Sequence, residues 1–268
     1  MAQGVVRTGI DARGVATVAL DRPEVHNAYD EQMIAELGDG LTALAGDPRV
    51  RLLVLRGEGR HFQAGADLGC LRRLAGAPPE VNRDFSWRTT EAMRRLGAFP
   101  RPTLALVHGA CYGGGVGMVA CCDIAIATEQ ASFALTEVRW GVIPAPIIPQ
   151  LCAAMGVRSL RRYGITGERF DAREALRIQL IHEICPEGAL DRAATPVIEA
   201  LLQSAPQAVA EAKQLVLAQA GLELSPHQVR TLALQAAVKR ASPEAAEGLA
   251  SFLEKRRPSW YPPESGSA

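Results

Sequence analysis

Glu137 is the residue of this sequence whose surroundings best suit it to move a proton. It lies within residues 131–144, a mostly apolar run that should desolvate its carboxylate and raise its pKa. A carboxyl group with a raised pKa can act as an acid or a base near neutral pH. An ion pair with a neighbour such as Arg139 is the structural alternative for this position.

Two stretches of small residues could present backbone N–H groups to a ligand. Residues 61–68 read HFQAGADL, between an expected strand and an expected helix, and residues 107–118 contain three consecutive glycines at an expected helix start. Free N–H groups at the positive end of a helix suit an anionic oxygen. A tight turn capped by Asp67 and close helix packing are the structural alternatives. The glycine spacing differs from the dinucleotide-binding G-x-G-x-x-G pattern.

Composition narrows the classes of partner. The chain has 268 residues, 48% of them apolar, and 29 basic residues balance 29 acidic ones. A formal net charge of zero gives no whole-chain attraction to nucleic acid or to an anionic membrane, and we expect neither as a partner. The sequence shows no signal-peptide pattern and no apolar run of about 18 residues, so we expect a cytoplasmic protein. The six cysteines lack metal-binding spacing, and we expect them to be reduced thiols. We also expect no metal, flavin or nicotinamide cofactor, since the sequence contains no motif for one.

Strand and helix patterns alternate in the first half of the chain. Period-2 and continuous apolar runs predict strands, and apolar residues at three- and four-residue spacing predict helices. This alternation predicts an α/β layered core. The expected strands are 5–10, 15–20, 51–56, 103–107 and 122–127, and the expected helices are 30–46, 70–74, one ending near 97, and 113–120.

After Pro149 the strand signals stop and helical periodicity takes over. We therefore divide the chain into an α/β core, residues 1–190, and a C-terminal helical region, residues 191–268. The tail 262–268 has a composition typical of disorder. The expected helices are 151–163, 172–181, 189–203, 206–220, 226–240 and 243–256.

Three segments, in their order and spacing, resemble the crotonase (enoyl-CoA hydratase/isomerase) superfamily. They are the A-G-A-D loop at 64–67, the G-G-G helix start at 113–115 and the E-x-x-x-G-x-x-P segment at 137–144. The resemblance implies a ClpP/crotonase-type spiral of β-β-α units with a C-terminal helical trimerisation region, assembled as a homotrimer or a dimer of trimers. Further matches to the family pattern lie at 20–28, 120–127, 165–172 and 248–256.

The resemblance also implies roles for individual residues. The N–H groups of Ala66 and Gly114 would form an oxyanion hole that polarises a thioester oxygen and stabilises an enolate. Glu137 would transfer the proton. The implied substrate is an acyl-CoA, with coenzyme A as part of that substrate and no separate cofactor. The implied substrate and coenzyme A contacts are Ala64, Asp67, Leu68, Gly113, Trp140, Phe252 and Lys255, of which the last two often serve the adjacent protomer.

The chain departs from the family pattern at two positions. Two-carboxylate hydratases of the family carry a glutamate three residues after the middle glycine, and Gly117 stands there in this sequence. One of the two carboxylates that would activate water is therefore absent. Relatives usually have glycine at the helix exit where this chain has Gln179, which puts the geometry of that turn in question.

A single carboxylate leaves the reaction open within the family. Local similarity around 137–145 and 114–123 is nearest to single-glutamate bacterial hydratases of methylglutaconyl-type CoA esters, and it favours hydration. A Δ3,Δ2-enoyl-CoA isomerase is the first alternative, because one carboxylate suffices to move a proton between two carbons. A non-catalytic acyl-CoA-binding protein is the second alternative, since Gly117 could mark a lost site.

Overall fold

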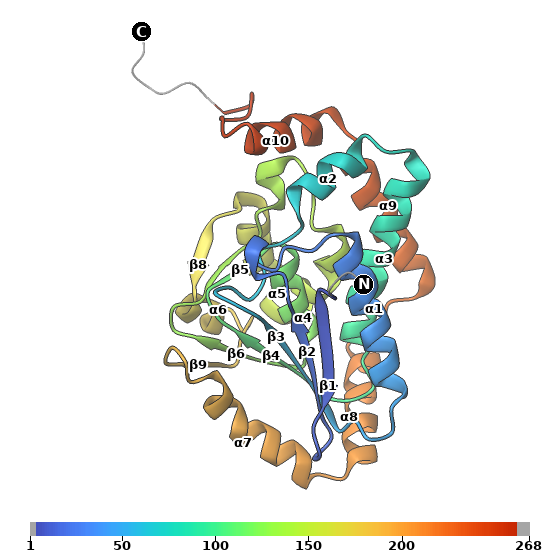
Figure 1. The fold of residues 1–268 in the computed structure, drawn as a ribbon, viewed down its shortest axis with the longest axis vertical. Coiled ribbons are helices and arrows are strands. Elements are labelled where there is room, and N and C mark those ends of the chain that lie inside the picture. The colour runs from blue at the N-terminus through green and yellow to red at the C-terminus, as the bar shows by residue number, and fades with distance from the viewer. Residues whose placement is uncertain (1–3, 262–268) are drawn as a thin grey trace.

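A six-stranded sheet forms the centre of the molecule. The computed structural model describes residues 4–261, so the tail 262–268 lies outside the described residues. The sheet has the order β1-β2-β3-β4-β6-β9, and only the β1–β2 pair is antiparallel. Figure 1 shows it edge-on between two layers of helices. Its strands are β1 (Val6–Ile10), β2 (Val15–Leu20), β3 (Leu52–Gly57), β4 (Thr103–Val107), β6 (Ile124–Thr128) and β9 (Glu183–Cys185).

A second sheet has three strands, in the order β5-β7-β8. In it β5 pairs in parallel with β7, and β7 pairs antiparallel with β8. Successive turns of chain therefore contribute one strand to each sheet, as in β4 and β5 or β6 and β7. This is the spiral of β-β-α units that the resemblance predicts. The strands are β5 (Ala110–Tyr112), β7 (Ser132–Ala134) and β8 (Arg169–Asp171).

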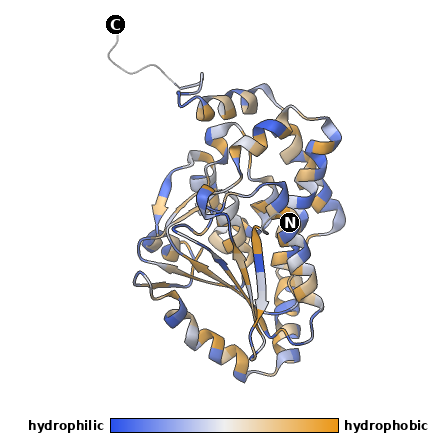
Figure 2. Ribbon diagram, in the orientation of Figure 1, coloured by the Kyte–Doolittle hydropathy of each residue, from blue (hydrophilic) through white to orange (hydrophobic). Residues whose placement is uncertain are grey.

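Both faces of the large sheet are buried, and alternate residues of each strand enter different cores. Leu53 and Leu55 of β3 belong to the same core as the buried residues of α1, whereas Leu52 and Val54 belong to the core on the opposite face. Continuous apolar strands are typical of a parallel sheet covered on both sides, and Figure 2 shows that hydrophobic residues predominate along these strands. The helices of the first half are α1 (Glu31–Gly46), α2 (Leu68–Ala75), α3 (Pro79–Gly97), α4 (Gly114–Cys121), α5 (Ile148–Thr166) and α6 (Ala172–Arg177).

The C-terminal helices wrap around the α/β layers. Helix α7 covers the second core through Leu190 and Ala194, α9 lies along α3, and α10 lies against α2 at the far end of the molecule (Figure 1). Helix α9 begins at a capping box formed by Ser225 and Gln228. These helices are α7 (Leu190–Gln203), α8 (Pro206–Gln219), α9 (Pro226–Arg240) and α10 (Pro243–Leu253).

The prediction that strands stop after Pro149 was wrong. Strands β8 and β9 both follow it, and β5 and β7 were also missed; all four have three residues, too few to show an alternating pattern. The helix expected over 172–181 ends at Arg177, and the one expected over 243–256 ends at Leu253. Gln179 adopts a left-handed φ of 66°, a conformation that favours glycine, so the turn at this position contains a strained residue.

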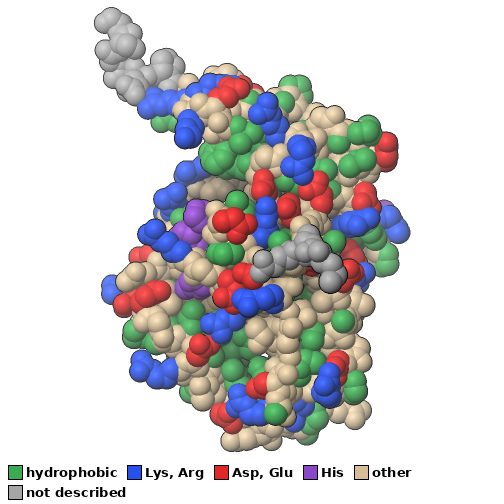
Figure 3. Space-filling view, viewed as in Figure 1, with side chains coloured by type: hydrophobic (Ala, Val, Ile, Leu, Met, Phe, Trp, Pro, Cys, Tyr) green, Lys and Arg blue, Asp and Glu red, His purple; other side chains and the backbone are tan. Residues whose placement is uncertain are grey.

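Charged side chains are mixed by sign on the face shown in Figure 3, where Lys and Arg lie among Asp and Glu. No helix within residues 4–261 combines the length and the apolar character needed to cross a bilayer. All six cysteines are free thiols.

Candidate active site

Two glycine-rich loops face each other at the centre of the site. One contains Gly65 and the other contains Gly113, and both glycines have positive φ values, 93° and 50°. A Cβ on Gly113 would lie 3.5 Å from Gly65 Cα and 3.2 Å from Glu137 Oε1. Side chains at these glycines would therefore fill the gap between the loops and press on the carboxylate. The structure thus brings the A-G-A-D loop, the triple glycine and Glu137 together.

The loop that carries Ala66 is fixed from below by two fully buried amides. Asn27 Nδ2 donates to the backbone oxygens of Glu58, His61 and Phe62 at 2.8, 2.8 and 3.2 Å. Gln63 Oε1 accepts from Gly65 N at 2.8 Å, and its Nε2 donates back to Gly65 O at 2.7 Å. A different loop conformation would leave these buried amides without hydrogen-bond partners, which costs free energy. The amides therefore stabilise the observed conformation of the loop.

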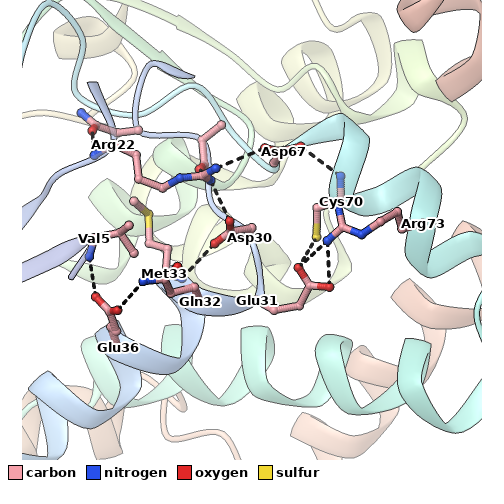
Figure 4. Close-up of polar contacts among 12 residues, drawn as sticks. Val5, Arg22, Asp30, Glu31, Gln32, Met33, Glu36, Asp67, Cys70 and Arg73 are labelled. Atoms are coloured by element: carbon pink, nitrogen blue, oxygen red, sulfur yellow. Dashed lines mark hydrogen bonds and ion pairs between the residues drawn. The ribbon is translucent and has the colours of Figure 1, made fainter. Parts of the chain in front are cut away.

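Arg22 ties the same loop to helix α1. Its guanidinium lies 3.1 Å from Asp30 Oδ2 and 3.6 Å from Asp67 Oδ2, as Figure 4 shows. Asp67 also caps α2, because its Oδ1 accepts from Cys70 N at 2.9 Å. Both carboxylate oxygens of Asp67 thus contact groups of its own chain, one on Arg22 and one on Cys70 of α2. Leu68 follows it as the first residue of α2, and Ala64 N donates to His26 O at 3.0 Å.

The two predicted oxyanion donors are free. Gly114 opens α4, and neither its N–H nor that of Ala66 donates to an acceptor within residues 4–261. Gly113 N donates instead to Ala134 O at 2.8 Å, which fixes the turn into the helix. Two unpaired N–H groups, one at a helix N-terminus, can stabilise negative charge on a ligand oxygen.

Glu137 is held in a desolvated position next to these donors. It starts the 3-10 helix η2 (Glu137–Trp140), and its Oε2 is buried without a hydrogen-bond partner among the described residues. Desolvation raises the pKa of Glu137 from 4.5 to about 7. The alternative of an ion pair with Arg139 is not realised in the structure. A carboxyl group of this kind can exchange a proton with a ligand near neutral pH.

Helix α10 of the same chain packs on η2. The rings of Trp140 and Phe252 meet edge to face with centroids 4.7 Å apart. A Cβ on Gly248 would lie 2.4 Å from the Trp140 carbonyl oxygen, so the helix backbone approaches η2 closely. Phe252 therefore contacts its own chain's η2. Lys255 is exposed just beyond the end of α10.

Tyr29 and Arg240 are two further residues of interest that the sequence motifs did not indicate. Tyr29 packs against Gly114, and Arg240 lies against α3. Tyr29 stacks on Phe85 with ring centroids 6.4 Å apart, and the Arg240 guanidinium carbon lies 5.1 Å from the centroid of the same Phe85 ring. Tyr29 directly follows the Asn27-Ala28 pair, which is the one sequence signal that could have pointed to it. Nothing near Arg240 in the sequence sets it apart from the other arginines of the chain.

Arg240 is a buried cation without an anionic partner in the part of the chain that the structure describes. It is 7% exposed, and its Nη1 donates to the neutral oxygens Asn82 Oδ1, at 2.5 Å, and Ser86 Oγ, at 3.0 Å. Its Nε is buried without a hydrogen-bond partner, and it forms no ion pair within the described part of the chain. Burial lowers its pKa. An uncompensated buried charge of this kind is costly.

Comparison with known proteins identifies the family. The model of the enoyl-CoA hydratase/isomerase family matches residues 11–263. A crystal structure of an enoyl-CoA hydratase from Shewanella pealeana is 41% identical, with a TM-score of 0.78 and 96% of each chain covered. The chain belongs to the enoyl-CoA hydratase/isomerase family. It is an enzyme of this family, and the family's substrates are acyl-CoA thioesters.

Two further relatives carry different reaction names. The hydroxycinnamoyl-CoA hydratase-lyase of Pseudomonas fluorescens is 33% identical over 203 residues, 75% of this chain and 74% of that protein. The mitochondrial Delta(3,5)-Delta(2,4)-dienoyl-CoA isomerase of Dictyostelium discoideum is 29% identical over 258 residues, 92% of this chain and 88% of that protein. Overall similarity thus leaves both hydration and isomerisation open.

Proposed function

We propose that the protein is an enoyl-CoA hydratase that adds water across the α,β double bond of an acyl-CoA thioester. The observation that carries the proposal is the placement of Glu137, desolvated, against Gly113, next to the free N–H groups of Ala66 and Gly114. The two N–H groups would bind the thioester oxygen, and Glu137 would transfer protons at the neighbouring acyl carbons.

The reaction requires one group to act twice. Glu137 as carboxylate takes a proton from water while the water oxygen bonds to Cβ, and the electron pair of the double bond moves onto the thioester as an enolate. The N–H groups of Ala66 and Gly114 stabilise that enolate, a contribution of roughly 3–4 kcal/mol per donor. Protonated Glu137 then returns its proton to Cα. A pKa near 7 suits both steps, because neither form of the acid is strongly favoured.

Isomerisation is the alternative reaction, and the same groups could perform it. Glu137 would then remove a proton from Cα of a 3-enoyl thioester and return it to Cγ, so that the double bond moves from C3–C4 to C2–C3. The absence of a second carboxylate at Gly117 favours this alternative, whereas the local sequence similarity favours hydration. Binding without turnover would correspond to the second alternative, an acyl-CoA-binding protein.

We further propose a branched or glutaconyl-type acyl group with a distal carboxylate. Arg240 supports this proposal, since it supplies a buried positive charge with no anionic partner among residues 4–261, one aromatic ring away from Tyr29. A substrate carboxylate would compensate that charge.

We also propose an oligomeric assembly for the protein. An apolar groove of about 430 Å³ supports a homotrimer or a dimer of trimers, because exposed apolar surface of this kind is often covered by a neighbouring subunit. We propose that the chain divides into the core 1–190 and the C-terminal helical region 191–268, and that the helical region contacts the adjacent subunit. We propose a cytoplasmic location. The groove is lined by residues such as Val138, Ile143, Val157, Ile165 and Leu232.

The deciding experiment is incubation with crotonyl-CoA, 3-hexenoyl-CoA and 3-methylglutaconyl-CoA in deuterated water, followed by mass spectrometry and NMR of the products. Gain of water by an enoyl-CoA supports hydration. A moved double bond with deuterium at Cγ and no added oxygen overturns hydration in favour of isomerisation. The Glu137→Gln variant is the matched control, and turnover near the wild-type rate in that variant would exclude the assigned role of Glu137.

A further inference from the structure

Tyr29 lies between the two halves of the oxyanion hole. Its N–H donates to Gly65 O at 3.0 Å and its carbonyl accepts from Asp67 N at 2.8 Å, so its backbone brackets Ala66. A Cβ on Gly114 would lie 2.5 Å from Tyr29 Cε1 and 3.2 Å from Tyr29 Oη. The ring therefore packs directly against the residue that supplies the second donor.

The hydroxyl of Tyr29 has no hydrogen-bond partner among the described residues, whereas the hydroxyls of Tyr112 and Tyr163 each have a side-chain partner. Glu137 Oε2 is fully buried without a partner within residues 4–261, whereas Tyr29 Oη is not among the fully buried atoms of this kind. The Tyr29 hydroxyl therefore keeps some accessible surface. A phenol held beside a ligand site without an internal acceptor is available to the ligand.

The phenol also stays protonated. Burial raises the pKa of Tyr29, and the nearby charge of Glu137 raises it further. Tyr29 is therefore a neutral donor over the whole range in which Glu137 titrates, and it does not compete with Glu137 for the role of base.

We propose that Tyr29 is a further catalytic residue whose hydroxyl donates a third hydrogen bond to the thioester oxygen of the bound acyl-CoA. The proposal rests on the proposed function only in requiring that a thioester oxygen binds at Ala66 and Gly114. No bond is made or broken at Tyr29. Its hydrogen bond strengthens as negative charge moves onto the oxygen, which stabilises the enolate in an enzyme that has only Glu137 to return the proton.

The test compares wild-type protein with Tyr29→Phe, which keeps the ring against Gly114 and removes only the hydroxyl. Tyr163→Phe is the matched control, because that hydroxyl donates to Glu174 away from the glycine loops. The first readout is the ¹³C shift of butyryl-CoA labelled at the thioester carbonyl when it binds. The second is the rate at which its α-protons exchange in deuterated water, with the dissociation constant measured alongside.

Tyr29→Phe should reduce the downfield ¹³C shift of the bound carbonyl and slow α-proton exchange about 10²-fold, with the dissociation constant within about threefold. Tyr163→Phe should match wild type in every readout. An unchanged carbonyl shift in Tyr29→Phe overturns the proposal, even if the wild-type protein neither hydrates nor exchanges. Exchange in wild type without hydration of any enoyl-CoA would instead overturn hydration and leave the role of Tyr29 supported.

Discussion

Ile147 fills the space into which a side chain at Gly117 would extend. A Cβ on Gly117 would lie 2.3 Å from Ile147 Cγ2 and 2.8 Å from its Cβ. Gly117→Ala should therefore lower the free energy of unfolding by roughly 1–3 kcal/mol through overpacking, measured by urea denaturation. Gly117→Glu alone should not raise hydration, because its carboxylate cannot reach the site past Ile147.

Gly46→Ala is the control for this prediction. Gly46 is the last residue of α1, and a Cβ there would meet nothing within 4 Å. That variant should keep or slightly raise stability, by about 0.5–1 kcal/mol. Equal urea midpoints for the two variants would contradict the steric role of Ile147.

The pKa of Glu137 predicts two opposite responses to pH. The base form is the carboxylate, so kcat/KM should rise with pH through about 7. Stability should respond in the other direction, because burial raises this pKa from 4.5 and the native state keeps a proton that the unfolded state has released. That contribution is complete below about pH 4.5 and is lost as pH rises through about 7, by at most about 3 kcal/mol.

Glu137→Gln should abolish the pH-dependent activity and flatten this part of the stability profile. Glu129→Gln, in the exposed turn after β6, is the control and should change neither. A Glu137→Gln stability profile that still follows the wild-type one between pH 4.5 and 7 would rule out a buried, titrating Glu137.

Asn27 should be essential to the shape of the loop that carries Ala66. Asn27→Ala removes three hydrogen bonds to backbone carbonyls of residues 58–62 and should lower the free energy of unfolding by about 2–4 kcal/mol. Asn27→Asp should act in the same direction, since it keeps the oxygen that accepts from Arg22 N but loses the donor. Unfolding at the wild-type urea concentration in both variants would show that the loop does not depend on this amide.

Arg240 should decide between neutral and carboxylated acyl groups. Arg240→Met should lower kcat/KM for 3-methylglutaconyl-CoA by about 10²-fold, since it removes a desolvated partner of the carboxylate, and should leave crotonyl-CoA within a few fold. Arg158→Met, at an exposed position of α5, is the control. Equal losses on both substrates would contradict a carboxylate site at Arg240.

Local patterns predicted most of the long elements and few of the short ones. Helix α1 was expected over 30–46 and lies at Glu31–Gly46, because its buried residues recur at helical spacing after the Asp30 cap. Strands β5 and β7 exist only because they pair with each other and with β8, so no local window contains their signal.

The site was predictable only as far as its motifs reach. The resemblance predicted that Ala66, Gly114 and Glu137 would lie close together. The spacing of these residues in the sequence could not have predicted it. The proximity of Tyr29 to Gly114 and of Arg240 to Phe85 arises from packing between segments distant in sequence. A single sequence carries no record of such long-range contacts.

The packing of α10 on η2 has a consequence for how the enzyme comes into being. Ribosomes deliver the N-terminal layers first, so Glu137 emerges more than a hundred residues before Phe252, whose ring packs on Trp140. A nascent or truncated chain lacking α10 would carry Glu137 on a 3-10 turn that lacks this packing. We therefore expect the proposed site to be complete only late in synthesis, once α10 has folded against η2.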